Sequence, residues 1–197
     1  NEAILCFKKL ESYIMQDQQS LNTEIIVDLY YKLANCYKYV NNREEAISYL
    51  EKIIELNTLN RNGYIELAEL YLEQNLTQSI DKAIEYAKKA VELEPEDVSS
   101  SLYLARAYLK KDLTNEALSC LKNVILKERD NKEAHWYLGL IYRNKEMYDE
   151  ANTHYNKILA TDPEYEYINS AIGSCFMLQK KYKEALTYYK KDYKNNP

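Results

Sequence analysis

The sequence predicts an all-α protein, a right-handed α-α superhelix (solenoid) of helix-turn-helix repeats. Two kinds of residue recur with one period, which is the signature of a repeat array. Alanines stand 37, 34, 34 and 34 residues apart, at Ala46, Ala83, Ala117, Ala151 and Ala185. Aromatic residues stand 34, 37, 34 and 34 residues apart, at Tyr37, Tyr71, Tyr108, Tyr142 and Phe176. The two longer intervals overlap between Tyr71 and Ala83, which places a single insertion within 74–79.

The spacing inside each repeat is helical. In its first half, a large, a small and an aromatic residue share one helical stripe, as in Leu33-Ala34-x-x-Tyr37. In its second half, steps of four and three residues mark another stripe, as in Ala117, Leu121 and Val124. Each repeat is therefore expected to be a hairpin of two short helices that pack through these stripes.

The composition supports long helices joined by brief connections. The chain has only three Gly and three Pro, whereas a β-sandwich needs a turn signal every ten residues or so. Asn41 and Asn75 are suited to ending first helices in left-handed backbone geometry. The 21 Tyr outnumber the two Phe and one Trp, and a tyrosine can fill a core position while its hydroxyl reaches water. A thin solenoid, whose core lies near the surface, has many such positions.

The stripes resemble those of the tetratricopeptide repeat (TPR) family. Its large-small-aromatic stripe, second-helix alanine and closing proline match Leu138-Gly139-x-x-Tyr142, Ala151-x-x-x-Tyr155 and Pro163. Pro95 and Pro197 close two further units, whereas other residues stand in place of proline in the remaining two. The resemblance implies five repeats, at 27–60, 61–97, 98–131, 132–165 and 166–197.

The two ends of the array differ from its middle. Residues 1–14 read as the second helix of a truncated repeat, and 15–26 as a loop. No polar capping helix follows the last repeat, although solenoids normally need one. We therefore expect a fragment of a longer array. Asp192 stands where Ile53, Ala90 and Val124 stand in other units, and we expect it to weaken the packing of the last helix.

No motif in the sequence indicates catalysis. There is no Gly-rich phosphate loop, GxSxG or HExxH. His135 and His154 are not expected to form a pair, and each is expected to fill a packing position. The four cysteines, which lack CxxC or metal-ligand spacing, are Cys6, Cys36, Cys120 and Cys175. The sequence thus predicts a protein that is not an enzyme, with no catalytic residue, no metal site and no cofactor.

Charge and hydropathy limit the classes of partner that we expect for this chain. The net charge is −5 and no block of basic residues exists, so we do not expect binding to nucleic acid. Membrane insertion is not expected either, because no apolar run of about 18 residues is present. Isolated cysteines and the lack of a signal peptide favour a reducing compartment, the cytoplasm or alternatively the nucleus.

The remaining candidate for function is a groove. In stacked helical hairpins the first helices line the concave side, and residues beside their core stripe point into the groove. Exposed aromatic residues with Arg beside them carry binding energy at interfaces. The predicted partner-binding residues are Tyr31, Ile65, Glu66, Glu69, Leu102, Tyr103, Arg106, Trp136, Tyr137 and Arg143. The alternative is that some of these side chains only cover neighbouring helices.

Two sub-types of the family do not fit these positions. Co-chaperones that grip a carboxylate need Lys and Asn in the groove, but only Asn35 matches, and Glu66 would repel a carboxylate. The Asn ladder of the TPR sugar transferase is replaced by residues such as Lys32 and Tyr137.

The leading hypothesis is therefore a protein-interaction scaffold within a multi-subunit complex. Its groove would bind an apolar or aromatic segment of a partner, either a helix or an extended peptide. One alternative is a regulatory or targeting array attached to an enzyme or transport component that lies outside this sequence. Another is homotypic assembly through the uncapped ends or the insertion near Asn75.

Overall fold

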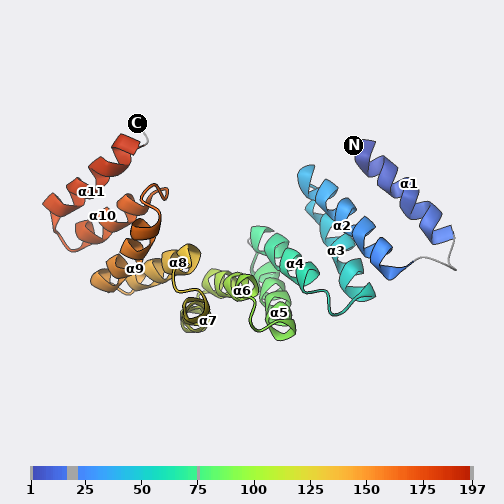
Figure 1. The fold of residues 1–197 in the computed structure, drawn as a ribbon, viewed down its shortest axis with the longest axis horizontal. Coiled ribbons are helices and arrows are strands. Elements are labelled where there is room, and N and C mark those ends of the chain that lie inside the picture. Colours follow the sequence, from blue (N-terminus) through green and yellow to red (C-terminus); the bar gives the residue numbers. More distant parts are fainter. Residues whose placement is uncertain (1, 17–21, 75, 196–197) are drawn as a thin grey trace. The chain divides into compact units, whose positions relative to one another are not determined.

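The computed structural model describes residues 2–16, 22–74 and 76–195, and all regular structure in these ranges is α-helix (Figure 1). The helices are α1 (Glu2–Gln16), α2 (Thr23–Tyr39), α3 (Arg43–Leu56), α4 (Arg61–Gln74), α5 (Thr77–Leu93), α6 (Val98–Lys110), α7 (Thr114–Lys127), α8 (Lys132–Asn144), α9 (Tyr148–Thr161), α10 (Ile168–Leu178) and α11 (Tyr182–Asn195). The prediction of an all-α chain is confirmed for this part of the sequence. The chain divides into two compact units, Asn1–Lys111 and Asp112–Pro197, which are described separately.

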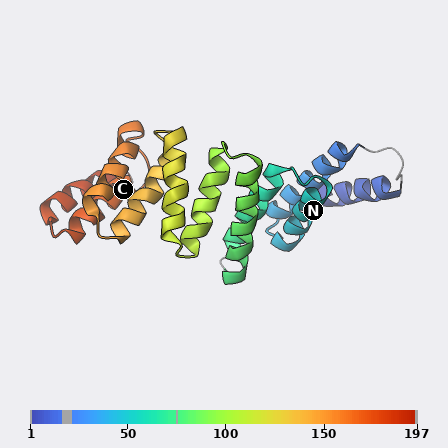
Figure 2. The same cartoon turned by 90° about the horizontal axis from the view of Figure 1, so that it is seen from below.

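Unit 1 is a stack of consecutive helices from α1 to α6 (Figure 2). Each helix packs on the next, and α6 also packs on α4. The predicted stripes form its core, because Leu33 and Ala34 of α2 are fully buried, as are Ala46, Leu50 and Ile53 of α3. Burial of these aliphatic side chains is the main stabilising term of such a stack.

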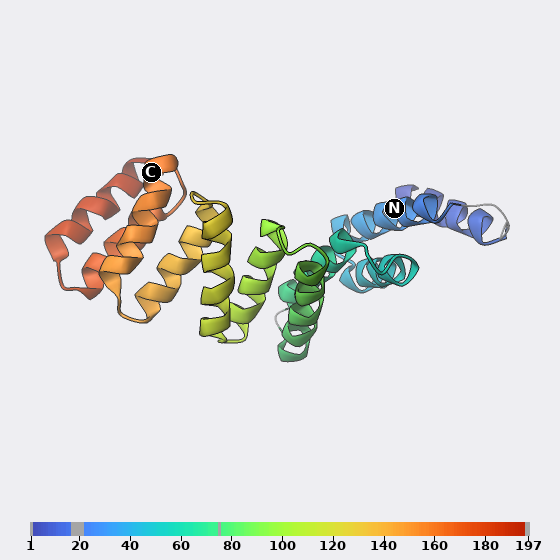
Figure 3. The same ribbon diagram turned by 60° about the horizontal axis from the view of Figure 1, so that its bottom comes forward.

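Unit 2 repeats this arrangement from α7 to α11 (Figure 3). Consecutive helices pack on one another, and the core of α9 and α10 contains Ala151, Tyr155, Ile158, Ile168 and Ile172, all fully buried. Gly139 of α8 lies against the ring of Tyr155, since a Cβ built on Gly139 would lie 2.7 Å from Tyr155 Cδ1. The small residue of the stripe therefore lets a tyrosine of the next helix approach the backbone.

Helix ends recur in the same form in three hairpins, each of which lies within one unit. The connection between the two helices contains a residue in the left-handed region, with φ of 58° at Asn41 in unit 1 and of 61° at Glu146 and 62° at Lys180 in unit 2. This conformation lets the chain turn back after the first helix. The prediction for Asn41 is confirmed, whereas Asn75 lies outside the described residues.

Asparagine and aspartate side chains start several helices. Carboxamide or carboxylate oxygens of Asn22, Asn42, Asn60, Asp97 and Asn131 accept a hydrogen bond from a backbone N–H in the first turn of the following helix. These bonds satisfy donors that have no partner inside the helix. Such caps explain why short helices can follow one another with connections of only a few residues.

The loop expected at 15–26 is shorter than predicted. Helix α1 continues to Gln16 and α2 already begins at Thr23, because Asn22 caps α2 by accepting a hydrogen bond from Glu24 N at 3.1 Å. Residues 17–21 of the predicted loop lie outside the described part. The closing Pro197 also lies outside it.

The three-residue insertion lengthens a helix. Helices α3, α7 and α9 each have 14 residues and begin three positions before their stripe alanine, whereas α5 has 17 and begins six positions before Ala83. The extra residues therefore add nearly one turn to the start of α5. Ser79 in this turn is buried, and its hydroxyl donates to Gln74 Oε1 at 2.7 Å.

One further expectation is corrected, and a contact of Asp192 that was not predicted is found. His135 and His154 do form a pair, because their Nδ1 atoms lie 2.9 Å apart across the α8–α9 hairpin. Asp192 does not simply face an apolar surface, since its carboxylate accepts a hydrogen bond from Ser170 N at 2.7 Å. It thereby caps α10, whose own N-cap residue Tyr167 makes no side-chain cap bond.

Candidate functional site

The first helices of unit 1 form a cleft that contains three of the predicted residues. It has a volume of about 440 Å³ and is lined by Asp28 and Tyr31 of α2 and by Asn62, Ile65 and Glu66 of α4. We call it the first-helix cleft. Tyr31, Ile65 and Glu66 are each partly exposed there, so they are accessible as the sequence predicts.

The wall of the cleft is held in place by Tyr31. Its hydroxyl donates to Asn60 Oδ1 at 2.7 Å, and the same oxygen accepts a hydrogen bond from Gly63 N at 2.9 Å. Burial, together with the negative charge of Glu66, raises the pKa of Tyr31 to about 12. The hydroxyl therefore stays neutral, and its bond to the capped start of α4 fixes the ring against that helix.

Charged side chains flank the cleft and link the three first helices of unit 1. Lys38 of α2 lies 3.4 Å from a Glu66 oxygen and 3.7 Å from a Glu69 oxygen. The hydroxyl of Tyr103, on α6, donates to Glu69 Oε1 at 3.0 Å, and the Arg106 guanidinium lies 5.1 Å from the Tyr103 ring centre. Four predicted residues thus belong to one polar network that runs from α2 to α6.

Leu102 does not belong to the accessible surface, so this prediction is wrong. Its side chain is only 8% exposed. Helix α6 packs on both α4 and α5, and an aliphatic side chain with no polar tip is buried at such a three-helix contact. The remaining predicted residues of unit 1 are partly exposed.

Sequence reasoning missed two residues of this region. Asp28 lines the first-helix cleft, and Lys38 lies 3.4 Å from an oxygen of Glu66. Asp28 stands three positions before Tyr31, a spacing that places two side chains on one helical face. That spacing was the available signal, but the prediction considered only positions next to the aromatic stripe.

Of the three predicted residues of unit 2, only Trp136 packs against the described core cluster of α9 and α10. Trp136 is partly buried, with its ring centre 5.7 Å from that of Tyr155 and 6.1 Å from that of Tyr165. The alternative interpretation, in which a side chain covers its neighbours, therefore applies to much of the Trp136 ring. Tyr137 and Arg143 are both partly exposed on α8. The charge of Arg143 acts on the buried Cys175 thiol, whose pKa burial nevertheless raises to about 11.

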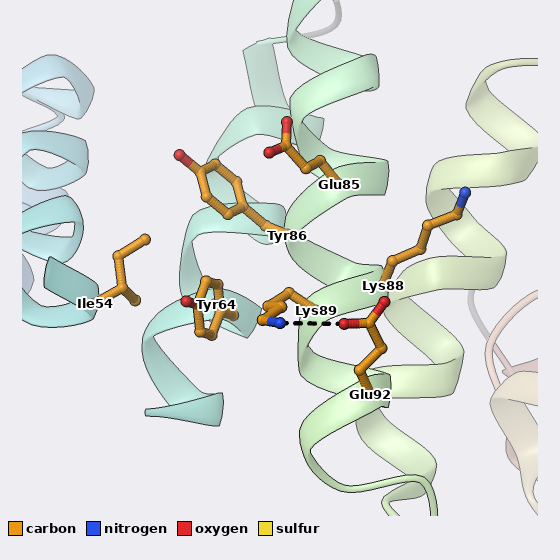
Figure 4. Close-up of a pocket in the computed structure, with 7 residues that line it drawn as sticks. All are labelled: Ile54, Tyr64, Glu85, Tyr86, Lys88, Lys89 and Glu92. Carbon is orange, nitrogen blue, oxygen red and sulfur yellow. Dashed lines mark hydrogen bonds and ion pairs between the residues drawn. The ribbon is translucent and has the colours of Figure 1, made fainter. Parts of the chain in front are cut away.

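A second pocket of unit 1 lies on the side of the second helices and was not predicted. The pocket has a volume of about 460 Å³. Figure 4 shows the residues that line it, which are Ile54, Tyr64, Glu85, Tyr86, Lys88, Lys89 and Glu92. Lys89 and Glu92 form an ion pair at 3.2 Å along the edge of this pocket (Figure 4). Burial raises the pKa of Tyr86 to about 12, so its hydroxyl is neutral. Because both glutamates and lysines line the pocket, its charge does not indicate one class of ligand.

The described residues offer no assembled metal or membrane site. No three His, Cys, Asp or Glu side chains among them are close enough to hold a metal ion together. Within the same ranges, no helix has the length and apolar character needed to cross a bilayer. The cysteines seen in these ranges are all free thiols.

Comparison with protein families decides the classification. Tetratricopeptide repeat models match residues 27–58, 77–138 and 132–165, which together are more than half of the chain. The chain belongs to the tetratricopeptide repeat family. The matched segments follow the helix pairs described above, and TPR arrays are protein-interaction scaffolds. None of the curated proteins matches the sequence.

Solved TPR structures have the same fold. The MamA 41-end structure from Desulfovibrio magneticus RS-1 has a TM-score of 0.77 at 19% identity, covering 86% of this chain and 94% of that one. TTC0263, a TPR protein from Thermus thermophilus, has a TM-score of 0.67 at 21% identity, covering 87% and 92%. YrrB, described as a TPR protein with an unusual peptide-binding site, has a TM-score of 0.69 at 20% identity, covering 97% and 92%. These likenesses confirm the predicted fold class, an all-α superhelix of helical repeats.

Proposed function

We propose that this TPR chain holds an apolar or aromatic segment of a partner protein on the first helices of unit 1. The supporting observation is the first-helix cleft, where Tyr31 and Ile65 supply apolar surface. The tyrosine ring is already fixed by its bond to Asn60, so little side-chain entropy is lost when a partner docks against it. Rigid aromatic residues of this kind are enriched among the residues that dominate binding energy.

The charges around the cleft narrow the class of partner. Asp28 and Glu66 line the cleft, and no Lys or Arg is among the lining residues. Their cationic neighbours are Lys32, 2.7 Å from Asp28, and Lys38, 3.4 Å from Glu66. A partner segment with an apolar side chain and no acidic residue beside it fits this surface, because carboxylates would repel those of the cleft.

Other features of the function are part of the same proposal. We propose a subunit of a larger assembly, in the cytoplasm or the nucleus, that carries no catalytic activity of its own. A net charge of −5 without a basic block supports a protein partner over a nucleic acid. The peptide-binding site described for YrrB, a protein of the same fold, supports a peptide segment as the bound element.

A pair of matched substitutions tests the proposal. Ile65→Glu places a third carboxylate in the first-helix cleft and is expected to reduce recovery of the partner at least tenfold, or about 1.4 kcal/mol. Ile54→Glu is the control, since Ile54 is also a half-buried isoleucine but lines the second-helix pocket. Partner recovery is measured by quantitative mass spectrometry after purification of each tagged variant from its native cells.

The comparison requires that both variants remain folded, which circular dichroism melting checks. The proposal holds if Ile65→Glu loses the partner and Ile54→Glu retains it. Equal recovery with the two variants, or loss with Ile54→Glu alone, would rule out the first-helix cleft as the binding surface.

A further inference from the structure

When both rings are neutral, only one arrangement of hydrogens satisfies the two hydrogen bonds of the histidine pair in unit 2. His135 Nε2 lies 3.0 Å from the carbonyl oxygen of Arg129, and its Nδ1 lies 2.9 Å from His154 Nδ1. A carbonyl only accepts, so His135 must carry a hydrogen on Nε2. In the neutral ring its Nδ1 is then an acceptor, and His154 must donate from Nδ1. The neutral pair therefore has one defined tautomer of each ring.

Protonation of either ring is energetically unfavourable in the folded hairpin. The first proton would go to His154 Nε2, because Nδ1 of that ring already carries the hydrogen of the bond to His135. It would create a cation beside a cavity of about 360 Å³ whose lining includes Ile125, Leu126 and Leu138. A second proton, on His135 Nδ1, would set two N–H donors against each other and remove the bond between the helices.

The side chains around the histidine pair do not stabilise a positive charge on it. Helix α7 contributes Lys122 to the cavity, and α8 contributes Tyr142, whose ring stacks on His154 at 5.4 Å. Among the described residues, no carboxylate lines this cavity or is hydrogen-bonded to either imidazole ring. A cation at His154 therefore meets a positive lysine and a weakly favourable aromatic face, but no counter-ion.

The equivalent position in unit 1 cannot respond in this way. There, Tyr49 stacks between Tyr30 and Tyr37, with ring centres 5.5 and 5.7 Å away, just as His154 lies between His135 and Tyr142. The α4–α5 hairpin likewise has only tyrosines in this position. Tyrosine does not gain a proton in the acidic range, so the histidine pair makes the α8–α9 hairpin different from both hairpins of unit 1.

We propose that the His135–His154 pair is an acid-sensitive latch, which holds α8 on α9 when both rings are neutral and loosens the hairpin as the pH falls. Helix α8 also carries Trp136 and Tyr137, directly after His135. The latch itself does not depend on a partner.

The direction of the pH effect on stability follows from the difference between the pKa of His154 in the folded chain and in the unfolded chain. Burial is the main cause that lowers the pKa of His154 to about 4. The unfolded chain, with an ordinary histidine pKa of about 6.5, binds the proton first. The contribution of His154 to the free energy of unfolding is therefore fully present above about pH 6.5. It is lost progressively as the pH falls to about 4.

Hydrogen exchange on the full chain tests the latch. Between about pH 7.5 and about pH 5, after correction for intrinsic exchange, the opening equilibrium of α8–α9 should rise about tenfold relative to α2–α3. The variant His135→Tyr with His154→Tyr introduces the residues found in unit 1 and should abolish this difference. Since no partner is present, the result is independent of whether the first-helix cleft binds one.

A second measurement needs no variant. Nitrogen-15 NMR of the wild-type imidazoles should show hydrogen on Nε2 of His135 and on Nδ1 of His154 at neutral pH. The latch is overturned if α8–α9 and α2–α3 respond equally to acid, or if the double variant keeps the difference. It is also overturned if zinc chloride protects α8–α9 in the wild type alone, because the two Nδ1 atoms would then be metal ligands.

Discussion

Alanine at position 139 is expected to destabilise unit 2 by about 2 kcal/mol, although alanine favours helices more than glycine does. The cause is steric, because the new Cβ would lie 2.7 Å from Tyr155 Cδ1. Tyr155 is fully buried, so its ring has no free space into which to move. Chemical denaturation followed by circular dichroism measures the loss.

A second substitution should restore the packing. The chain itself pairs Ala34 with Leu50 at the same positions of an earlier repeat, so Gly139→Ala combined with Tyr155→Leu recreates a native combination. We expect the double variant to be at least about 1 kcal/mol more stable than the sum of the single effects implies. Strict additivity would show that the two positions do not touch.

Glutamate at position 151 should have an even larger effect, a loss of about 4 kcal/mol in the free energy of unfolding. Ala151 is fully buried in the core of α9 and α10 together with Ile158 and Ile172. A carboxylate there would lose its hydration and find no cation within the core. The same denaturation experiment measures this loss.

Asn156→Glu is the matched control, because position 156 is exposed on the same helix. It should change stability by less than about 0.5 kcal/mol. If Ala151→Glu were tolerated as well as Asn156→Glu, the alanine series could not be the buried stripe of the second helices.

The helical hairpins could be predicted because they depend on a repeated pattern. The series of Ala46, Ala83 and their equivalents specifies a buried stripe, and the structure buries each of these alanines fully. The helix ends were less predictable, since Glu146 and Lys180 adopt left-handed geometry although neither residue favours it. There the geometry of the hairpin dominates over the preference of the single residue.

Only part of the candidate site could be found from the sequence. Helical periodicity identified Tyr31, Ile65 and Glu66 as residues of one face, and the structure brings them together in the first-helix cleft. Periodicity does not show which neighbouring helices cover a side chain. Leu102 was therefore predicted to lie at the surface, although α6 packs on two helices and buries it. Burial depends on contacts between helices that no spacing within one helix reports.

The histidine pair illustrates the same limit. His135 and His154 are 19 residues apart on different helices, and each one alone fits a packing position. Their hydrogen bond depends on the depth at which α8 and α9 pack, which the sequence pattern does not give. Comparison of equivalent positions across repeats was the available signal, because Tyr30 and Tyr49 occupy the same places in unit 1.

Photo-crosslinking in native cells tests most directly whether the first helices of unit 1 hold a partner. A benzophenone amino acid is placed at Asn62, an exposed residue of the first-helix cleft, or at Glu85, an exposed residue of the second-helix pocket. The proposed function predicts a discrete partner crosslinked from position 62 and none from position 85. Crosslinking from position 85 alone would contradict it.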